Sequence, residues 1–201
     1  MTFSFLVETY ATERLKTLTV WSEFRETDLE FRPEARARSV REHMVHQCLS
    51  EDAWFSKMLE LSVTIPALPA EESRLAFLEA YAETSGQRLA LLAAQPESWF
   101  NDVRRFFDED RSRAWILVRR IAHSAHHRGQ LTTYHRLLGH DLYSTYGPTA
   151  DTGGLPANGA TVVYRYRSVA DLLAGERAGG EHPPLSGSGT KPVTERPPGR
   201  T

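Results

Sequence analysis

Five of the eight histidines lie in two short groups whose spacing could build a metal site. His43 and His46 form the first group, and His123, His126 and His127 form the second. Residues four apart on a helix lie about 40° apart around its axis and about 6 Å apart along it, so His123 and His127 could point at one ion. The first group would supply a third imidazole. Three neutral imidazoles leave a position for water or substrate.

The spacing of the histidines does not fix which of them bind. His126 is three residues from His123 and could replace His127, and His43 could replace His46. Single histidines are usually surface residues or hydrogen-bonded residues of a core, and the HxxxH pattern is weak by itself. The ligand set therefore stays open at this level.

Four long segments with helical periodicity must position these histidines, and they span residues 5–24, 40–62, 75–92 and 112–138. Ser39 and Glu42 have the pattern of a capping box, which predicts that the second helix begins near Val40. Pro96 ends the third helix, and Gly139 is a natural cap for the fourth. The segment 97–110 carries crowded aromatic residues without a clear period, and we predict that it is irregular.

These helices predict an all-α protein built as a four-helix bundle, whose core is a common place for metal sites. Residues 1–140 would form the metal-binding bundle. Residues 141–178 are rich in turn formers and predict an irregular C-terminal extension packed on the bundle, with a short extended piece and a helical turn. Residues 179–201 contain few large apolar residues and predict a disordered tail.

The composition argues against several classes of partner. A formal net charge of −2 gives no general attraction for nucleic acid, and no apolar run approaches the length of about 20 residues that a membrane span needs. The N-terminus has acids and no basic stretch ahead of its short apolar run, which is untypical of a secretory signal. The single cysteine, Cys48, cannot form an internal disulfide, and two residues from His46 it should face away from the ion. We therefore expect a cytoplasmic protein.

Two stretches carry a resemblance to a known family. The sequence SVREHMVH at 39–46, followed by Glu51 and Trp54, and the sequence IAHSAHHRGQL at 121–131 are similar to the two signature regions of DinB-like (DinB/YfiT-type) proteins. The loop YGPTADTGG at 146–154 resembles a loop of one branch of that family. The resemblance implies a four-helix bundle with a divalent ion, commonly zinc or nickel, bound by His46, His123 and His127.

Relatives of this family include thiol-dependent S-transferases and isomerases, so the resemblance implies a metal-dependent thiol S-transferase acting on small electrophiles, with a low-molecular-weight thiol as co-substrate. Arg128 or Tyr134 could orient the thiol or the electrophile. Two alternatives remain, a metal-dependent hydrolase and a non-catalytic, stress-linked metal-binding protein. The expected partner is a small-molecule substrate rather than nucleic acid or a membrane, and a homodimer is compatible with this prediction.

Overall fold

Helices dominate the structure, a computed structural model that describes residues 2–187 and 189. Its long helices are α1 (Ser4–Ser22), α2 (Val40–Ala53), α3 (Arg74–Ala93) and α5 (Arg113–Leu137). The chain divides into two compact units, Met1–Leu131 and Thr132–Thr201, and α5 begins in the first and ends in the second. None of the described helices is long and apolar enough to cross a membrane.

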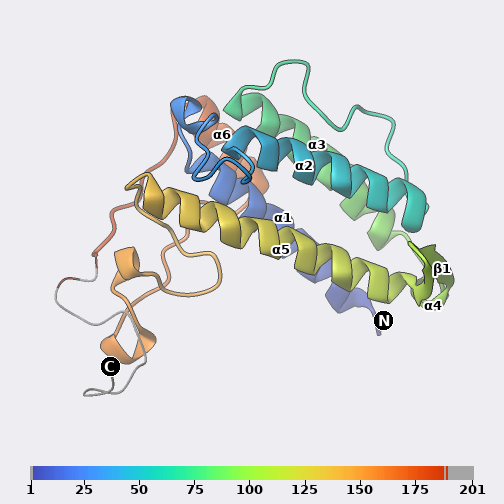
Figure 1. Ribbon diagram of the computed structural model, residues 1–201. Coiled ribbons are helices and arrows are strands. Elements are labelled where there is room, and N and C mark those ends of the chain that lie inside the picture. Colours follow the sequence, from blue (N-terminus) through green and yellow to red (C-terminus); the bar gives the residue numbers. More distant parts are fainter. Residues whose placement is uncertain (1, 188, 190–201) are drawn as a thin grey trace. The chain divides into compact units, whose positions relative to one another are not determined.

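Four long helices form where the sequence predicted them, and α1, α3 and α5 begin and end within two residues of the predicted bounds. In the first unit the four helices run alongside one another (Figure 1). Polar contacts connect them in a closed ring. Arg14 of α1 hydrogen-bonds to Ser85 of α3, and Arg88 of α3 bonds to Asp52 of α2. Arg120 of α5 bonds to Ser50 of α2, and Arg128 of α5 returns to α1, where it pairs with Glu13. Each helix is therefore fixed to two neighbours.

The second helix departs from the prediction at its C-terminal end. The α-helix stops at Ala53, and a π-helical segment, η2 (Trp54–Met58), follows it. Glu60 then takes a positive φ of 58°, and the Leu61 amide donates to the Phe55 carbonyl at 2.8 Å, which closes the helix end. The prediction of a continuous helix to residue 62 was wrong because a left-handed residue other than glycine gives no signal in the sequence.

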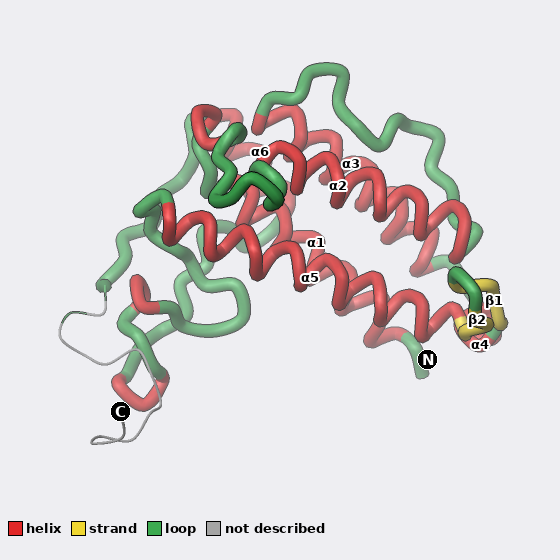
Figure 2. Tube along the Cα trace, in the orientation of Figure 1, coloured by secondary structure: helices red, strands yellow, loops and turns green. Residues whose placement is uncertain are grey.

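The segment 97–110 has regular secondary structure, whereas the sequence predicted an irregular stretch. It forms a short helix, α4 (Glu97–Asn101), followed by the antiparallel strands β1 (Val103–Phe106) and β2 (Glu109–Ser112). The two strands pair from Val103 opposite Ser112 to Phe106 opposite Glu109. Figure 2 shows this hairpin at one end of the first unit. Phe107 begins the turn with a φ of 53°, where hairpins usually place asparagine or glycine. The sequence therefore lacked the usual signal for a hairpin.

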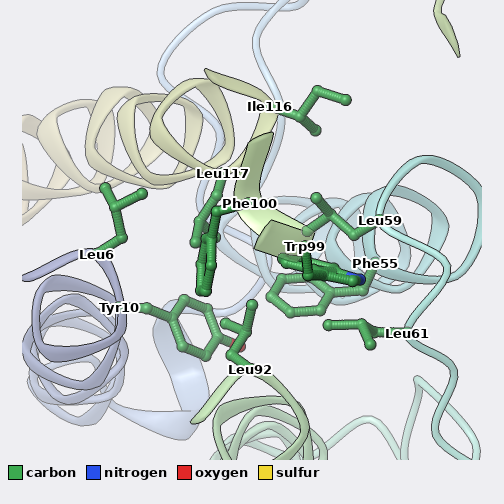
Figure 3. Packing of buried hydrophobic residues seen from close by; sticks show 10 residues of the cluster. All are labelled: Leu6, Tyr10, Phe55, Leu59, Leu61, Leu92, Trp99, Phe100, Ile116 and Leu117. Atoms are coloured by element: carbon green, nitrogen blue, oxygen red, sulfur yellow. The ribbon is translucent and has the colours of Figure 1, made fainter. Parts of the chain in front are cut away.

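A hydrophobic cluster joins the hairpin end of the first unit to the long helices (Figure 3). Its buried members come from α1, the π-helical segment and the residues after it, α3, α4 and the first turn of α5: Leu6, Tyr10, Phe55, Leu59, Leu61, Leu92, Trp99, Phe100, Ile116 and Leu117. A buried leucine or phenylalanine contributes about 1.5–3 kcal/mol to the free energy of unfolding. The cluster therefore holds the start of α5 against the π-helical segment that follows α2.

The second unit contains the end of α5, two short 3-10 helices, η3 (Ala150–Thr152) and η4 (Pro156–Asn158), and α6 (Val169–Arg177). Helix α6 confirms the predicted helical turn, whereas the described residues of this unit form no strand. The division after Leu131 falls inside α5, which continues without a break to Leu137. A bundle domain that ends at residue 140 stays a prediction. Of the predicted tail, residue 188 and residues 190–201 lie outside the described residues.

Candidate metal centre

Two helices bring the histidines together. The Ser39 hydroxyl accepts from the Glu42 amide at 3.2 Å, and the Glu42 carboxylate accepts from the Ser39 amide at 2.8 Å, so the predicted capping box is confirmed. This cap fixes the start of α2 and places His46 in its second turn. His123 and His127 lie one turn apart in α5.

The three predicted histidines converge on one point. His46, His123 and His127 each offer a ring nitrogen, and these atoms lie within 4.8 Å of one another. The His123 and His127 Nε2 atoms are 3.1 Å apart, and the His46 ring centroid lies 4.6 Å from that of His127. Three imidazoles that meet in this way form a group that could hold a metal ion.

The rival histidines flank this group without joining it. The His43 ring is buried and its centroid lies 5.4 Å from that of His127. The His126 ring is exposed on the other side, 5.1 Å from the His127 ring. Residues three apart on a helix differ by about 60° in direction, which turns His43 toward the interior and His126 toward solvent.

Of the two residues expected to orient the substrate, Arg128 is bound to side chains of α1. Arg128 is buried, and its guanidinium pairs with the Glu13 carboxylate and donates to the Thr17 hydroxyl at 2.9 Å. It therefore ties α5 to α1. Tyr134 is buried and belongs to the part of α5 in the second unit. Cys48 is buried, and burial together with the nearby Glu51 raises the pKa of its thiol to about 12, so it is no nucleophile.

Hydrogen bonds define how the two α5 histidines are held. A guanidinium can only donate, so Arg120 Nη1 donates to His123 Nδ1 across 3.1 Å. The His123 Nε2–H then donates to His127 Nε2, and the His127 Nδ1–H donates to Gln130 Oε1 at 2.8 Å. Gln130 thus occupies the position of the acceptor that usually orients a metal-bound imidazole. Before His123 Nε2 can bind an ion, its proton has to leave that nitrogen.

Trp54 packs against one face of the His123 imidazole. Its indole stacks on the imidazole with the ring centroids 5.7 Å apart and the planes inclined by 21°. Trp54 begins the π-helical segment, and such segments frequently occur at functional sites. The π-helical turn therefore affects the candidate site directly, because it carries the Trp54 ring that packs against His123.

The histidines open into a cleft of about 500 Å³, a size that suits a small molecule. Its lining combines the three converging imidazoles with a fourth histidine, two arginines and one alanine: Arg38, His46, Arg119, Ala122, His123, His126 and His127. The described residues that line the cleft include no carboxylate. An ion held by the imidazoles would therefore face a cleft rich in positive charge.

The environment keeps the imidazoles neutral. Burial lowers the pKa of His123 to about 3, with a further contribution from the Arg120 guanidinium. Burial lowers the pKa of His127 to about 4, opposed by its hydrogen bond to Gln130. Burial and the positive charges of Arg38 and Arg120 lower the pKa of His46. Imidazoles bind metal only in their neutral form, and all three rings are neutral at neutral pH.

These depressed pKa values predict that the metal-free protein becomes less stable as the pH falls. Above about pH 6.5 the histidines are neutral in the folded and the unfolded chain. Between there and the folded value of about 4 for His127, the unfolded chain takes up a proton that the folded chain does not, so the free energy of unfolding decreases. Urea unfolding at about pH 7.5 and about pH 5 should show a smaller decrease in the His127→Gln variant than in the wild type. Equal decreases would mean that the His127 pKa is not depressed.

Most of the residues around the triad could not be recognised beforehand. Arg120 lies three residues before His123, a spacing that could have suggested a contact along the helix. Gln130 lies three residues after His127, so the same reasoning applies to it. The contacts of Trp54 and Arg38 with the site depend on tertiary structure, since both come from outside α5.

The fold and the histidine cluster define a mostly helical protein with a candidate metal centre. A sequence model described as DinB family matches residues 2–154, and the chain belongs to the DinB family. This confirms the resemblance in the two histidine regions.

Two solved structures have a similar fold. A DinB-like protein from Bacillus cereus is 17% identical, with a TM-score of 0.63 over 70% of this chain and 95% of that chain. A DinB-like protein from Bacillus subtilis is 16% identical, with a TM-score of 0.55 over 68% of this chain and 94% of that chain. At such identities the likeness shows the fold alone. No curated protein matches the chain.

Proposed function

We propose that this DinB protein binds one divalent ion, zinc or nickel, through His46, His123 and His127, and that the four long helices are the bundle that carries the site. The convergence of three neutral imidazoles from two helices at the floor of a cleft supports this proposal. Their donor chemistry fits zinc and nickel, which accept imidazole nitrogen readily. Gln130 fits as well, because it accepts from the second nitrogen of His127.

We further propose that the protein is a metal-dependent thiol S-transferase acting on small electrophiles. A divalent ion with an open position lowers the pKa of a bound thiol and supplies a thiolate at neutral pH. In the transfer the thiol loses its proton to solvent, the sulfur forms a bond to the electrophilic carbon, and the leaving group departs with the bonding electron pair. The cleft, with a volume of about 500 Å³, has room for a small thiol and a small electrophile together.

The test follows thiol consumption by zinc-loaded and nickel-loaded protein with cysteine, glutathione and other small thiols, and with chlorodinitrobenzene as the electrophile. We expect turnover that depends on thiol and metal and disappears in the His127→Ala variant, while His126→Ala retains it. If only p-nitrophenyl acetate is turned over, by attack of water, the hydrolase alternative takes the place of the transferase. If metal binds and neither reaction is accelerated, the non-catalytic alternative does.

A further inference from the structure

Two arginines stand beside the histidines in the cleft, one from each side. Arg38 immediately precedes the capping residue Ser39 of α2, and Arg119 lies in α5 one turn before His123. Both side chains are exposed and both line the cleft. The two guanidinium groups therefore border the same space as the imidazole nitrogens.

The charged neighbours of Arg38 in sequence do not line the cleft. The neighbouring acid does not fill the cleft, because the Glu42 carboxylate is taken up by the guanidinium of Arg32 and the amide of Ser39. Arg36 belongs to the same loop but points away, since its side chain is 92% exposed and pairs with Glu34.

Neutral imidazoles cannot balance the charge of a divalent ion. The ion and two guanidinium groups would leave the cleft with a surplus of positive charge, and its described lining offers no carboxylate to reduce that surplus. A concave site of one sign concentrates ligands of the opposite sign. Guanidinium groups also bind carboxylate and phosphate oxygens through paired hydrogen bonds, which neutral ligands cannot provide.

We propose that Arg38 and Arg119 select a small ligand that carries an anionic oxygen group, a carboxylate or a phosphate, next to the atom that occupies the open position of the metal. The inference rests on the proposed metal site and names the class of ligand that this site takes. Arg38 and Arg119 are specificity residues in this arrangement, and the three histidines hold the metal.

The test uses cobalt-substituted protein and two thiols that differ only in their charged end, mercaptopropionate and mercaptopropanol. The near-ultraviolet absorption of a cobalt–thiolate bond reports binding of either thiol. We expect wild-type protein to bind mercaptopropionate on the order of tenfold more tightly, with a preference that shrinks as salt is added. The Arg38→Gln/Arg119→Gln variant should lose the preference, because its affinity for mercaptopropionate should fall by more than its affinity for mercaptopropanol. Displacement of mercaptopropanol by inorganic phosphate, measured in parallel, tests the phosphate alternative.

Matched variants separate the possible failures. Arg36→Gln removes one positive charge from the same loop and should keep the preference for mercaptopropionate. The Arg38→Lys/Arg119→Lys variant should recover part of that preference. Absence of cobalt from every protein, with no visible absorption band, would overturn the proposed metal site. Cobalt binding with equal affinity for both thiols and no arginine-dependent displacement by phosphate would overturn the ligand class alone. If the Arg38→Gln/Arg119→Gln variant does not bind cobalt, the affinities for the two thiols are compared in the single variants Arg38→Gln and Arg119→Gln.

Discussion

Replacing His127 with alanine should abolish stoichiometric metal binding, whereas replacing its neighbour His126 should leave it intact. The His127 ring nitrogens face His123 and Gln130, and its ring is the centre of the cluster, closer to His46 than the His123 ring is. Loss of one of three protein ligands should weaken zinc affinity by at least about a hundredfold, because even outer-shell changes cost about 10–100-fold. Metal content after dialysis against a weak chelator measures the effect.

The pair of neighbouring histidines makes this experiment specific. Both residues lie in the same turn of α5 and both line the cleft, so their alanine variants remove the same group from nearly the same place. The His126 ring is exposed, and its loss should change metal content little. Equal metal loss in the two variants would replace the proposed triad by a set that includes His126. Full metal retention in the His127→Ala variant would exclude His127 as a ligand.

The choice between neighbouring histidines illustrates what the sequence alone could predict. Helical periodicity located the long helices, and the capping box located the start of α2, because both depend on residues close in the chain. The spacing of the histidines left His43 and His126 as alternatives. Only the packing of α2 against α5 showed that the nitrogens of His46, His123 and His127 lie within 4.8 Å of one another.

The features that the sequence did not reveal depend on backbone conformations without a residue signature. Glu60 and Phe107 both adopt positive φ angles that glycine or asparagine would normally occupy. The first closes the helix that carries Trp54, and the second makes the turn of the hairpin. Tertiary packing stabilises both: Glu60 pairs with Arg104 and Arg113, and the Phe107 ring packs against Phe106 and Trp54.

A buried carboxylate connects the core of the first unit to the histidines. Glu51 has no exposed surface, and its oxygens accept from the Tyr10 hydroxyl at 2.7 Å and the Tyr81 hydroxyl at 2.9 Å. The guanidinium groups of Arg88 and Arg120 lie 3.5 Å and 3.3 Å from it. Because Arg120 also donates to His123 Nδ1, the position of a candidate metal ligand depends on this carboxylate.

Replacing Glu51 with alanine should lower the free energy of unfolding by about 3–5 kcal/mol, the usual effect of removing one partner from a buried ion pair. The change leaves two guanidinium groups in the interior with less compensation, since both arginines are 1% exposed. Arg88 keeps its bond to Asp52 at 2.8 Å, so Arg120 should bear most of the loss. Urea unfolding of the metal-free protein, followed by circular dichroism, measures the difference.

Two further variants identify the cause of that loss. Glu51→Gln keeps the volume and part of the hydrogen bonding, so it should cost less than alanine if unmade hydrogen bonds dominate and as much as alanine if the missing charge dominates. Glu83 of α3 is exposed, and Glu83→Ala should change stability by no more than about 0.5 kcal/mol. A loss below about 1 kcal/mol in Glu51→Ala would show that Glu51 is not needed to compensate the buried guanidinium groups. Arg120 would then hold its place beside His123 through its bond to Ser50 and its packing over Trp54.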